Sequence, residues 1–132
     1  MHAACSTDRR VARIPCGLDA PAEARRWAAW LTVAVAPATG EAILIAVSEL
    51  VANAVRHSGL PAGALIEVRG ELRRDRVTLM VRDRGVGLPA SPPPSPPPAS
   101  SGGSRGLYLV GLLATRVLMD PPAGAVTCEF AR

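Results

Sequence analysis

The sequence has no lysine, and this absence excludes two large classes of phosphate-handling protein. All 15 basic residues among the 132 are arginine, and the formal net charge is +4. P-loop nucleotide hydrolases and eukaryotic-type protein kinases both place a lysine on the phosphates of their nucleotide. This chain therefore belongs to neither class.

Aromatic residues are also scarce, at 3% of the sequence. Proteins that bind single-stranded nucleic acids stack bases on aromatic rings that lie beside basic residues. Here the arginines form no long run and have no aromatic companions, so we do not expect nucleic acid binding. Hydrophobic residues still make up 48% of the chain, which means that aliphatic residues and alanine must build the core.

Signals for metal binding, disulfides and membrane insertion are missing as well. Cys5, Cys16 and Cys128 lie far apart, are odd in number and form no CxxC pair, so we interpret them as free or buried thiols. The unbroken apolar runs are shorter than the roughly 18 residues of a membrane span. The N-terminus has no apolar stretch typical of a secretory signal. The sequence predicts a cytoplasmic protein that does not bind membranes.

The length and the hydrophobic pattern predict one domain, with residues 1–9 as a tail and residues 10–132 as the folded part. The pattern predicts strands over 10–16, 64–74, 76–83 and 124–130, and helices over 19–31, 38–59 and 105–118. Strands and helices alternate too unevenly for a doubly wound parallel sheet. We therefore predict an α+β fold, a two-layer sandwich in which helices back a mixed sheet.

Residues 90–104, ASPPPSPPPASSGGS, interrupt this pattern. A proline run is not compatible with a helix or a central strand. It favours an extended polyproline II segment, here followed by a flexible serine and glycine stretch.

The longest predicted helix carries a polar stripe on an otherwise aliphatic surface. Glu49, Asn53, Arg56 and His57 stand at positions i, i+4, i+7 and i+8, which places them on one face. Such a stripe faces either solvent or a binding site. The residues alone leave both interpretations open.

Two glycine-containing segments follow. In VRDRGVGLP (81–89) a strand ends in Asp83, whose carboxylate can accept a hydrogen bond from an exocyclic amine such as that of adenine. An ordinary turn has the same composition. In SGGSRGLYLVG (101–111) glycines precede an apolar helix, and the free N–H groups at a helix N-terminus attract anions.

Taken in order, these segments resemble the motifs of the GHKL ATP-binding superfamily, which includes gyrase-type topoisomerases, sensor histidine kinases, heat-shock chaperones and mismatch-repair ATPases. The chain is most similar to the small anti-sigma-factor serine kinases of bacteria. VSELVANAVRHSG resembles their N box, VRDRGVGLP their first glycine box and SRGLYLVGLLATRV their second. The resemblance covers roughly residues 10–130 and implies a Bergerat-type fold.

The resemblance assigns roles to residues in the first two motifs. It implies that Asn53 ligates Mg²⁺ through its amide oxygen, and that Glu49 is the general base that accepts the proton of an attacking hydroxyl. One amide suffices because Mg²⁺ keeps several water and phosphate ligands. Asp83 is expected to contact the adenine amine, and Gly85 and Gly87 to leave room for the base.

In the third motif the resemblance places Gly103, Arg105 and Gly106 near the phosphates, with Gly106 and Leu107 opening the helix that donates backbone N–H groups. A guanidinium suits phosphate, so Arg105 is either a γ-phosphate contact or a surface arginine. Residues 90–104 take the place of the ATP lid, and their prolines are a departure from the family pattern.

The function implied is that of an ATP- and Mg²⁺-dependent serine/threonine kinase that acts as an anti-sigma factor. It would bind a sigma factor, phosphorylate an anti-sigma-factor antagonist and form a homodimer. The retained Glu49 favours catalysis. The proline-rich lid favours the alternative, a non-catalytic module of the same fold whose ATP occupancy sets its choice of protein partner.

Overall fold

The computed structural model describes residues 8–57, 59–83, 88–98 and 105–132. The strands are β1 (Asp8–Pro15), β2 (Leu65–Leu72), β3 (Arg76–Arg82), β4 (Arg116–Asp120) and β5 (Ala125–Ala131). The helices are α1 (Ala20–Thr32), α2 (Pro37–His57) and α3 (Arg105–Leu113), with a short 3-10 turn, η3 (Pro121–Ala123), between β4 and β5.

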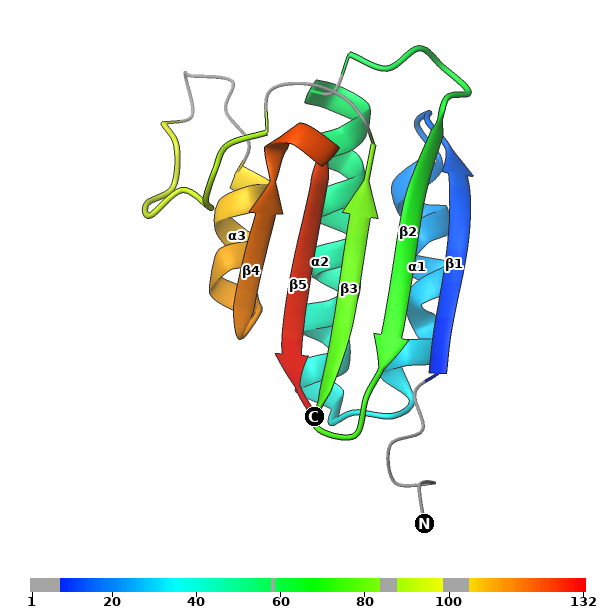
Figure 1. Cartoon of the computed structure of the whole chain (residues 1–132), viewed down its shortest axis with the longest axis vertical. Helices are drawn as coiled ribbons and strands as arrows, with labels where there is room; N and C mark the ends of the chain where they lie inside the picture. Colours follow the sequence, from blue (N-terminus) through cyan, green and yellow to red (C-terminus); the bar gives the residue numbers. More distant parts are fainter. Residues whose placement is uncertain (1–7, 58, 84–87, 99–104) are drawn as a thin grey trace.

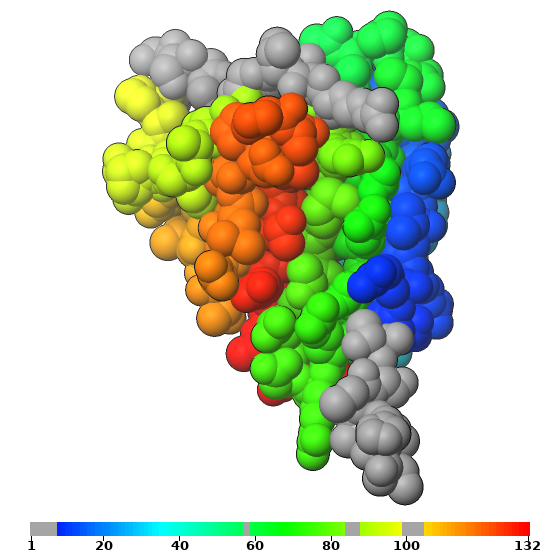
Figure 2. Space-filling model, in the orientation of Figure 1, coloured from blue at the N-terminus to red at the C-terminus, as the bar shows by residue number. Residues whose placement is uncertain are grey.

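The strands form one sheet in the order β1-β2-β3-β5-β4, and α1, α2 and α3 all lie on one face of it (Figure 1). Figure 2 shows the other face, which no helix of the described residues covers. The predicted two-layer α+β sandwich is therefore confirmed. The predicted mixed character of the sheet is not, because each pair of neighbouring strands in the described chain is antiparallel. β3 and β4 run in the same direction, but β5 lies between them (Figure 1).

The last predicted helix is shorter than expected. The sequence pattern extends it to residue 118, whereas α3 ends at Leu113 and the chain then enters β4. Two hydrogen bonds of Thr115 to β5 hold the chain where it leaves α3 and enters β4. The Thr115 N–H donates to the Glu129 carbonyl at 2.8 Å, and its Oγ1 accepts from the Ala131 N–H at 3.2 Å. β4 alternates, with Val117 and Met119 packed on the core, so a short edge strand was hidden in an apolar run.

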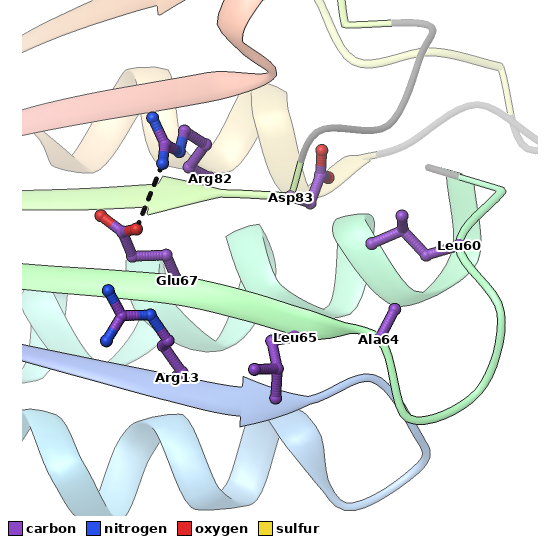
Figure 3. A pocket seen from close by; sticks show the side chains of 7 residues that line it. All are labelled: Arg13, Leu60, Ala64, Leu65, Glu67, Arg82 and Asp83. Atoms are coloured by element: carbon purple, nitrogen blue, oxygen red, sulfur yellow. Dashed lines mark hydrogen bonds and ion pairs between the residues drawn. The ribbon is translucent and has the colours of Figure 1, made fainter.

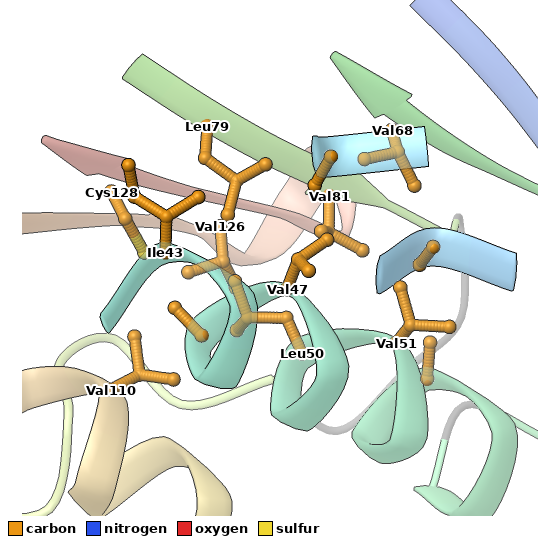
Figure 4. Close-up of a cluster of buried hydrophobic side chains, with 14 of the residues drawn as sticks. Ile43, Val47, Leu50, Val51, Val68, Leu79, Val81, Val110, Val126 and Cys128 are labelled. Carbon is orange, nitrogen blue, oxygen red and sulfur yellow. The ribbon is translucent and has the colours of Figure 1, made fainter. Parts of the chain in front are cut away.

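The core lies between the sheet and the helices (Figure 4). α2 supplies its centre through side chains spaced three and four residues apart, and the sheet supplies alternate residues of β2, β3 and β5. Fully buried members include Ile43, Val47, Val51, Val68, Val77, Leu79 and Cys128. Aliphatic side chains build this core, as the scarcity of aromatics predicts.

Part of α2, Pro37–Arg56, is long and apolar enough to cross a membrane by length and composition, with a mean hydropathy of 1.4. In the structure this helix packs on the sheet and contacts α1 on one side and α3 on the other. The core helix of a globular domain has the same composition, because it is covered on most of its circumference.

The two cysteines in the described chain are buried free thiols, as expected, and Cys5 lies outside the described residues. Burial raises the pKa of the Cys128 thiol to about 12. The thiol therefore stays protonated at neutral pH and acts as a small hydrophobic side chain in the core.

Candidate functional site

The predicted site residues in the described chain come together at one end of the sheet. The second half of α2, the end of β3 and the start of α3 all lie there (Figure 1). Asn53 lies in α2, Asp83 directly follows β3 and Arg105 begins α3, although the three residues are far apart in the sequence. They lie at the same end of the sheet because α2 and β3 both end there and α3 begins there.

The polar stripe of α2 is turned away from α1. Ser48 faces α1, since its hydroxyl accepts a hydrogen bond of 2.8 Å from Arg25 of that helix. Successive residues of a helix are rotated by about 100°, which places Glu49 and Asn53 on the opposite flank, toward α3 and solvent. Both are half-buried, whereas Arg56, about one turn after Asn53, is exposed. His57 ends the helix, and its side chain lies outside what is described.

Asp83 is the first residue after β3. Its backbone N–H donates to the Gly124 carbonyl at 3.1 Å, which ties the end of β3 to the start of β5. Gly124 has a φ of 65°, a left-handed conformation that glycine adopts without strain, so a glycine at this position allows the hydrogen bond to Asp83. The side chain of Asp83 is half-buried. Gly85 and Gly87 lie outside the described residues.

The start of α3 agrees with the predicted start of the last helix. Arg105 is exposed, whereas Gly106 and Leu107 are buried, and Leu107 packs into the core. The first N–H groups of an α-helix have no partner within the helix. The packing of Leu107 therefore holds a set of donors at a fixed place at this end of the sheet. Gly103 lies outside the described residues.

The proline-rich segment lies along α3 and the start of β4. Pro92, Pro93 and Pro94 line a cavity of about 350 Å³ together with residues of both elements. The contact with α3 is close, because a Cβ on Gly111 would lie 3.1 Å from the Cβ of Pro92. The chain also bends at Pro94–Ser95, so the prolines do not form the single extended segment that their composition predicts.

The donor set fits magnesium bound through a nucleotide better than a metal held by protein alone. In the described ranges, no group of three or more histidine, cysteine, aspartate or glutamate side chains lies close enough to hold a metal ion. The Asn53 amide oxygen is a hard ligand of the type that Mg²⁺ accepts beside water and phosphate oxygens. Asn53 and the donors at the start of α3 would hold such a group between them.

Comparison with protein families matches residues 15–128 of this chain to the histidine kinase-like ATPase domain. Comparison with curated proteins gives no match. Among solved structures, a crystal structure of the RsbU and RsbW domains of Rv1364c from Mycobacterium tuberculosis is similar, with a TM-score of 0.67 at 19% sequence identity. The similarity covers 95% of this chain and 31% of that one, and at this identity it establishes the fold.

Proposed function

We propose that this chain, which belongs to the histidine kinase-like ATPase domain family, binds ATP with Mg²⁺ at the end of the sheet where α2, β3 and α3 meet. The observation that carries the proposal is that Asn53, Asp83 and Arg105 gather there from distant parts of a chain whose family match spans residues 15–128. Their chemistry suits a metal, an amine and a phosphate respectively.

The residues at this end of the sheet would contact three parts of Mg²⁺-ATP: the base, the metal and the phosphates. Asp83 accepts a hydrogen bond from the adenine amine, and Gly85 and Gly87 leave room for the base. Asn53 is the metal ligand, and Gly103, Arg105, Gly106 and Leu107 border the phosphates with their backbone N–H groups and one guanidinium. Magnesium, when bound, neutralises charge on the phosphates.

We further propose that Glu49 is the general base of a phosphoryl transfer to a serine or threonine hydroxyl. The hydroxyl oxygen bonds to the γ-phosphorus, the bond between that phosphorus and the β–γ bridging oxygen breaks, and the hydroxyl proton passes to the Glu49 carboxylate. Glu49 lies one helical turn before Asn53 on the same flank of α2, which supports this assignment. ADP and a phosphorylated protein side chain are the products.

The partners proposed are those of anti-sigma-factor kinases: a sigma factor and an antagonist protein, in the cytoplasm, with the chain as a homodimer. The fold shared with a structure that contains an RsbW domain supports this assignment at the level of the fold. The second candidate is a non-catalytic module in which ATP occupancy selects the protein partner. The proline segment on α3 favours it, because prolines have no N–H group to donate to phosphates.

Calorimetric titration of the 132-residue chain with ATP and Mg²⁺, beside GTP, tests the proposal. We expect ATP to bind and GTP to bind at least about tenfold more weakly, because an aspartate that accepts from the adenine amine has no such donor in guanine at that position. Asn53→Ala should abolish Mg²⁺-dependent binding, while Glu49→Gln keeps binding and loses phosphoryl transfer.

Glu41→Gln is the matched control, since Glu41 is an exposed carboxylate near the other end of the same helix. Unchanged ATP binding by Asn53→Ala would contradict the metal assignment. Unchanged transfer by Glu49→Gln would leave the chain with a different base, and transfer absent from the wild type with every partner would favour the non-catalytic module.

A further inference from the structure

A second concave site lies on the face of the sheet opposite α1, α2 and α3. It is a pocket of about 400 Å³ lined by Arg13, Leu60, Ala64, Leu65, Glu67, Arg82 and Asp83 (Figure 3). Its volume is near the lower end of the range of small-molecule sites, about 300–1,000 Å³. The size therefore favours a small ligand over a cofactor.

Three neighbouring strands build the floor of this pocket in one cross-strand row. Arg13 of β1 is paired with Glu67 of β2, and Glu67 is paired with Arg82 of β3. Residues in one row of a sheet point to the same face, and Figure 3 shows the three side chains lying side by side. Leu60, Ala64 and Leu65 form an apolar wall at the end of this row.

Glu67 is already shared between two arginines. Its Oε2 accepts from Arg69 at 2.9 Å and its Oε1 accepts from Arg82 at 3.3 Å, and only 12% of its side chain is exposed. Both carboxylate oxygens are therefore engaged with cations other than Arg13.

Arg13 differs in this respect from the other arginines of the first three strands. Each of those forms an ion pair with a carboxylate: Arg9 with Glu71, Arg10 with Asp8, Arg69 and Arg82 with Glu67, and Arg76 with Asp75. Within the described part of the chain, Arg13 has neither a hydrogen bond nor an ion pair through its side chain. Its guanidinium is a strong bidentate donor that the fold leaves unused beside a pocket.

Two rows farther along the same face, where Arg9 is paired with Glu71, an arginine does have a carboxylate partner. Glu71 accepts hydrogen bonds from Arg73 and Arg9. Burial raises the pKa of the Glu71 carboxyl, but the hydrogen bonds and charges of the two arginines outweigh burial and the pKa is lowered overall. In the described chain no equivalent carboxylate reaches Arg13, so its exposed guanidinium is open to an anion from solution.

We propose that this pocket binds a small aliphatic carboxylate, with the carboxylate on the Arg13 guanidinium and the aliphatic body against Leu60, Ala64 and Leu65. The lining holds two arginines and two carboxylates, whose formal charges cancel, so it offers no net positive charge to a dianion, and the apolar wall gains nothing from an inorganic ion. A monoanion with a short hydrocarbon body satisfies both parts of the lining. This site is on the opposite face of the sheet from α2 and rests on Arg13, which has no part in the proposed function, although Asp83 both lines the pocket and is proposed to contact adenine.

The test is an NMR titration of the ¹⁵N-labelled chain, without nucleotide, using 4-methylpentanoate as the probe. We expect saturable shifts of the backbone amides of Arg13, Glu67 and Arg82 at probe concentrations on the order of 10 mM, a range typical of ligands with few atoms. The uncharged analogue 4-methylpentanamide has the same body and should bind at least about tenfold more weakly, because it lacks the charge-assisted pair.

Arg13→Gln should weaken binding of the probe by about tenfold. Arg9→Gln is the matched control, because Arg9 projects from the same face of the same strand but lies outside the pocket, and it should leave the affinity unchanged. Equal affinity for acid and amide, or an Arg13→Gln variant that binds as well as the wild type, would overturn the proposal. Tighter binding of inorganic phosphate than of the probe would also overturn it.

Discussion

The two ends of the sheet are closed in different ways. At the end where β5 finishes, Arg132 is bonded to two turns. Its backbone N–H donates to the Asp75 carbonyl at 3.1 Å and its Nη1 to the Arg73 carbonyl at 2.8 Å, both in the β2–β3 turn, and its Nε donates to the Ala34 carbonyl between α1 and α2 at 3.1 Å. At the opposite end, polar side chains of α2, β3 and α3 are half-buried or exposed (Figure 1). The first end is closed by hydrogen bonds between segments, and the second end holds the proposed site residues.

α2 runs from one end of the sheet to the other, and a core residue and a proposed site residue lie far apart along it. Ile43, near its start, is fully buried, and Asn53, ten residues later, is a half-buried polar side chain about 15 Å farther along the axis. Substitutions more than 7–10 Å apart without shared partners act almost independently. Stability and nucleotide binding should therefore respond to different positions of one helix.

The largest expected effect is on stability, at Ile43. Replacing Ile43 by alanine removes a fully buried side chain that packs between α2 and the sheet (Figure 4). We expect the free energy of unfolding to fall by about 2–5 kcal/mol, since a cavity remains in a close-packed core. Urea unfolding measures the loss, and ATP affinity below the transition should stay within about twofold of the wild type.

Ile45→Ala is the matched control, because Ile45 is the same residue type two positions later with 40% of its surface exposed. It should cost less than about 1 kcal/mol, since less apolar area is lost from the interior. Similar losses in both variants would mean that α2 is not seated on the sheet through the Ile43 side.

The next effect concerns the ends of a single strand. Asp83 follows β3 at the end with the proposed site, and Asp75 precedes it at the other end. We expect Asp83→Asn to weaken ATP binding by roughly 1–3 kcal/mol, the cost of a lost hydrogen bond to a charged group. Asp75→Asn should leave ATP affinity unchanged, because the Asp75 side chain is exposed at the opposite end of the strand, where it pairs with Arg76 at 3.5 Å.

Competition between ATP and GTP in the same titrations sharpens the assignment. If Asp83 reads the adenine amine, its substitution reduces the preference for ATP as well as the affinity. A preference for ATP that survives in Asp83→Asn would remove Asp83 from the base-binding role, whatever happens to the affinity.

Much of the fold is readable from the sequence because hydrophobic periodicity decides it. The long apolar helix with a polar stripe and the strand pair around Asp75 appear within a few residues of their predicted bounds. β4 was missed for a physical reason: in RVLMD three of five residues are apolar, and a short apolar run continues a helix pattern as well as it starts a strand. The segment is a strand because it pairs with β5, and a short window of local sequence does not contain that long-range pairing.

The open-face pocket shows the other limit of sequence reading. Arg13, Glu67 and Arg82 lie in three segments with no common motif, and only the strand registers place them in one row. Nothing in the sequence marks Arg13, because the feature that sets it apart from the other arginines of β1, β2 and β3 is the lack of a carboxylate partner in the described part of the folded chain. The motif residues, in contrast, can be recognised in the sequence because each motif is one short contiguous segment.

The smallest expected effect belongs to the end of the sheet that Arg132 closes. Arg132→Ala removes two side-chain hydrogen bonds to backbone carbonyls of Ala34 and Arg73, both at exposed positions. We expect the free energy of unfolding to fall by about 1 kcal/mol, because water replaces exposed hydrogen bonds at little cost. Arg132→Lys keeps the charge but cannot reach both carbonyls in the geometry of a guanidinium, so it should recover less than half of the loss. Arg74→Ala, an exposed arginine of the neighbouring turn, is the control and should change nothing measurable. If Arg132→Lys restores full stability, the positive charge at this position stabilises the fold, and the two guanidinium hydrogen bonds do not. The two ends of the sheet would then not differ in the way proposed here.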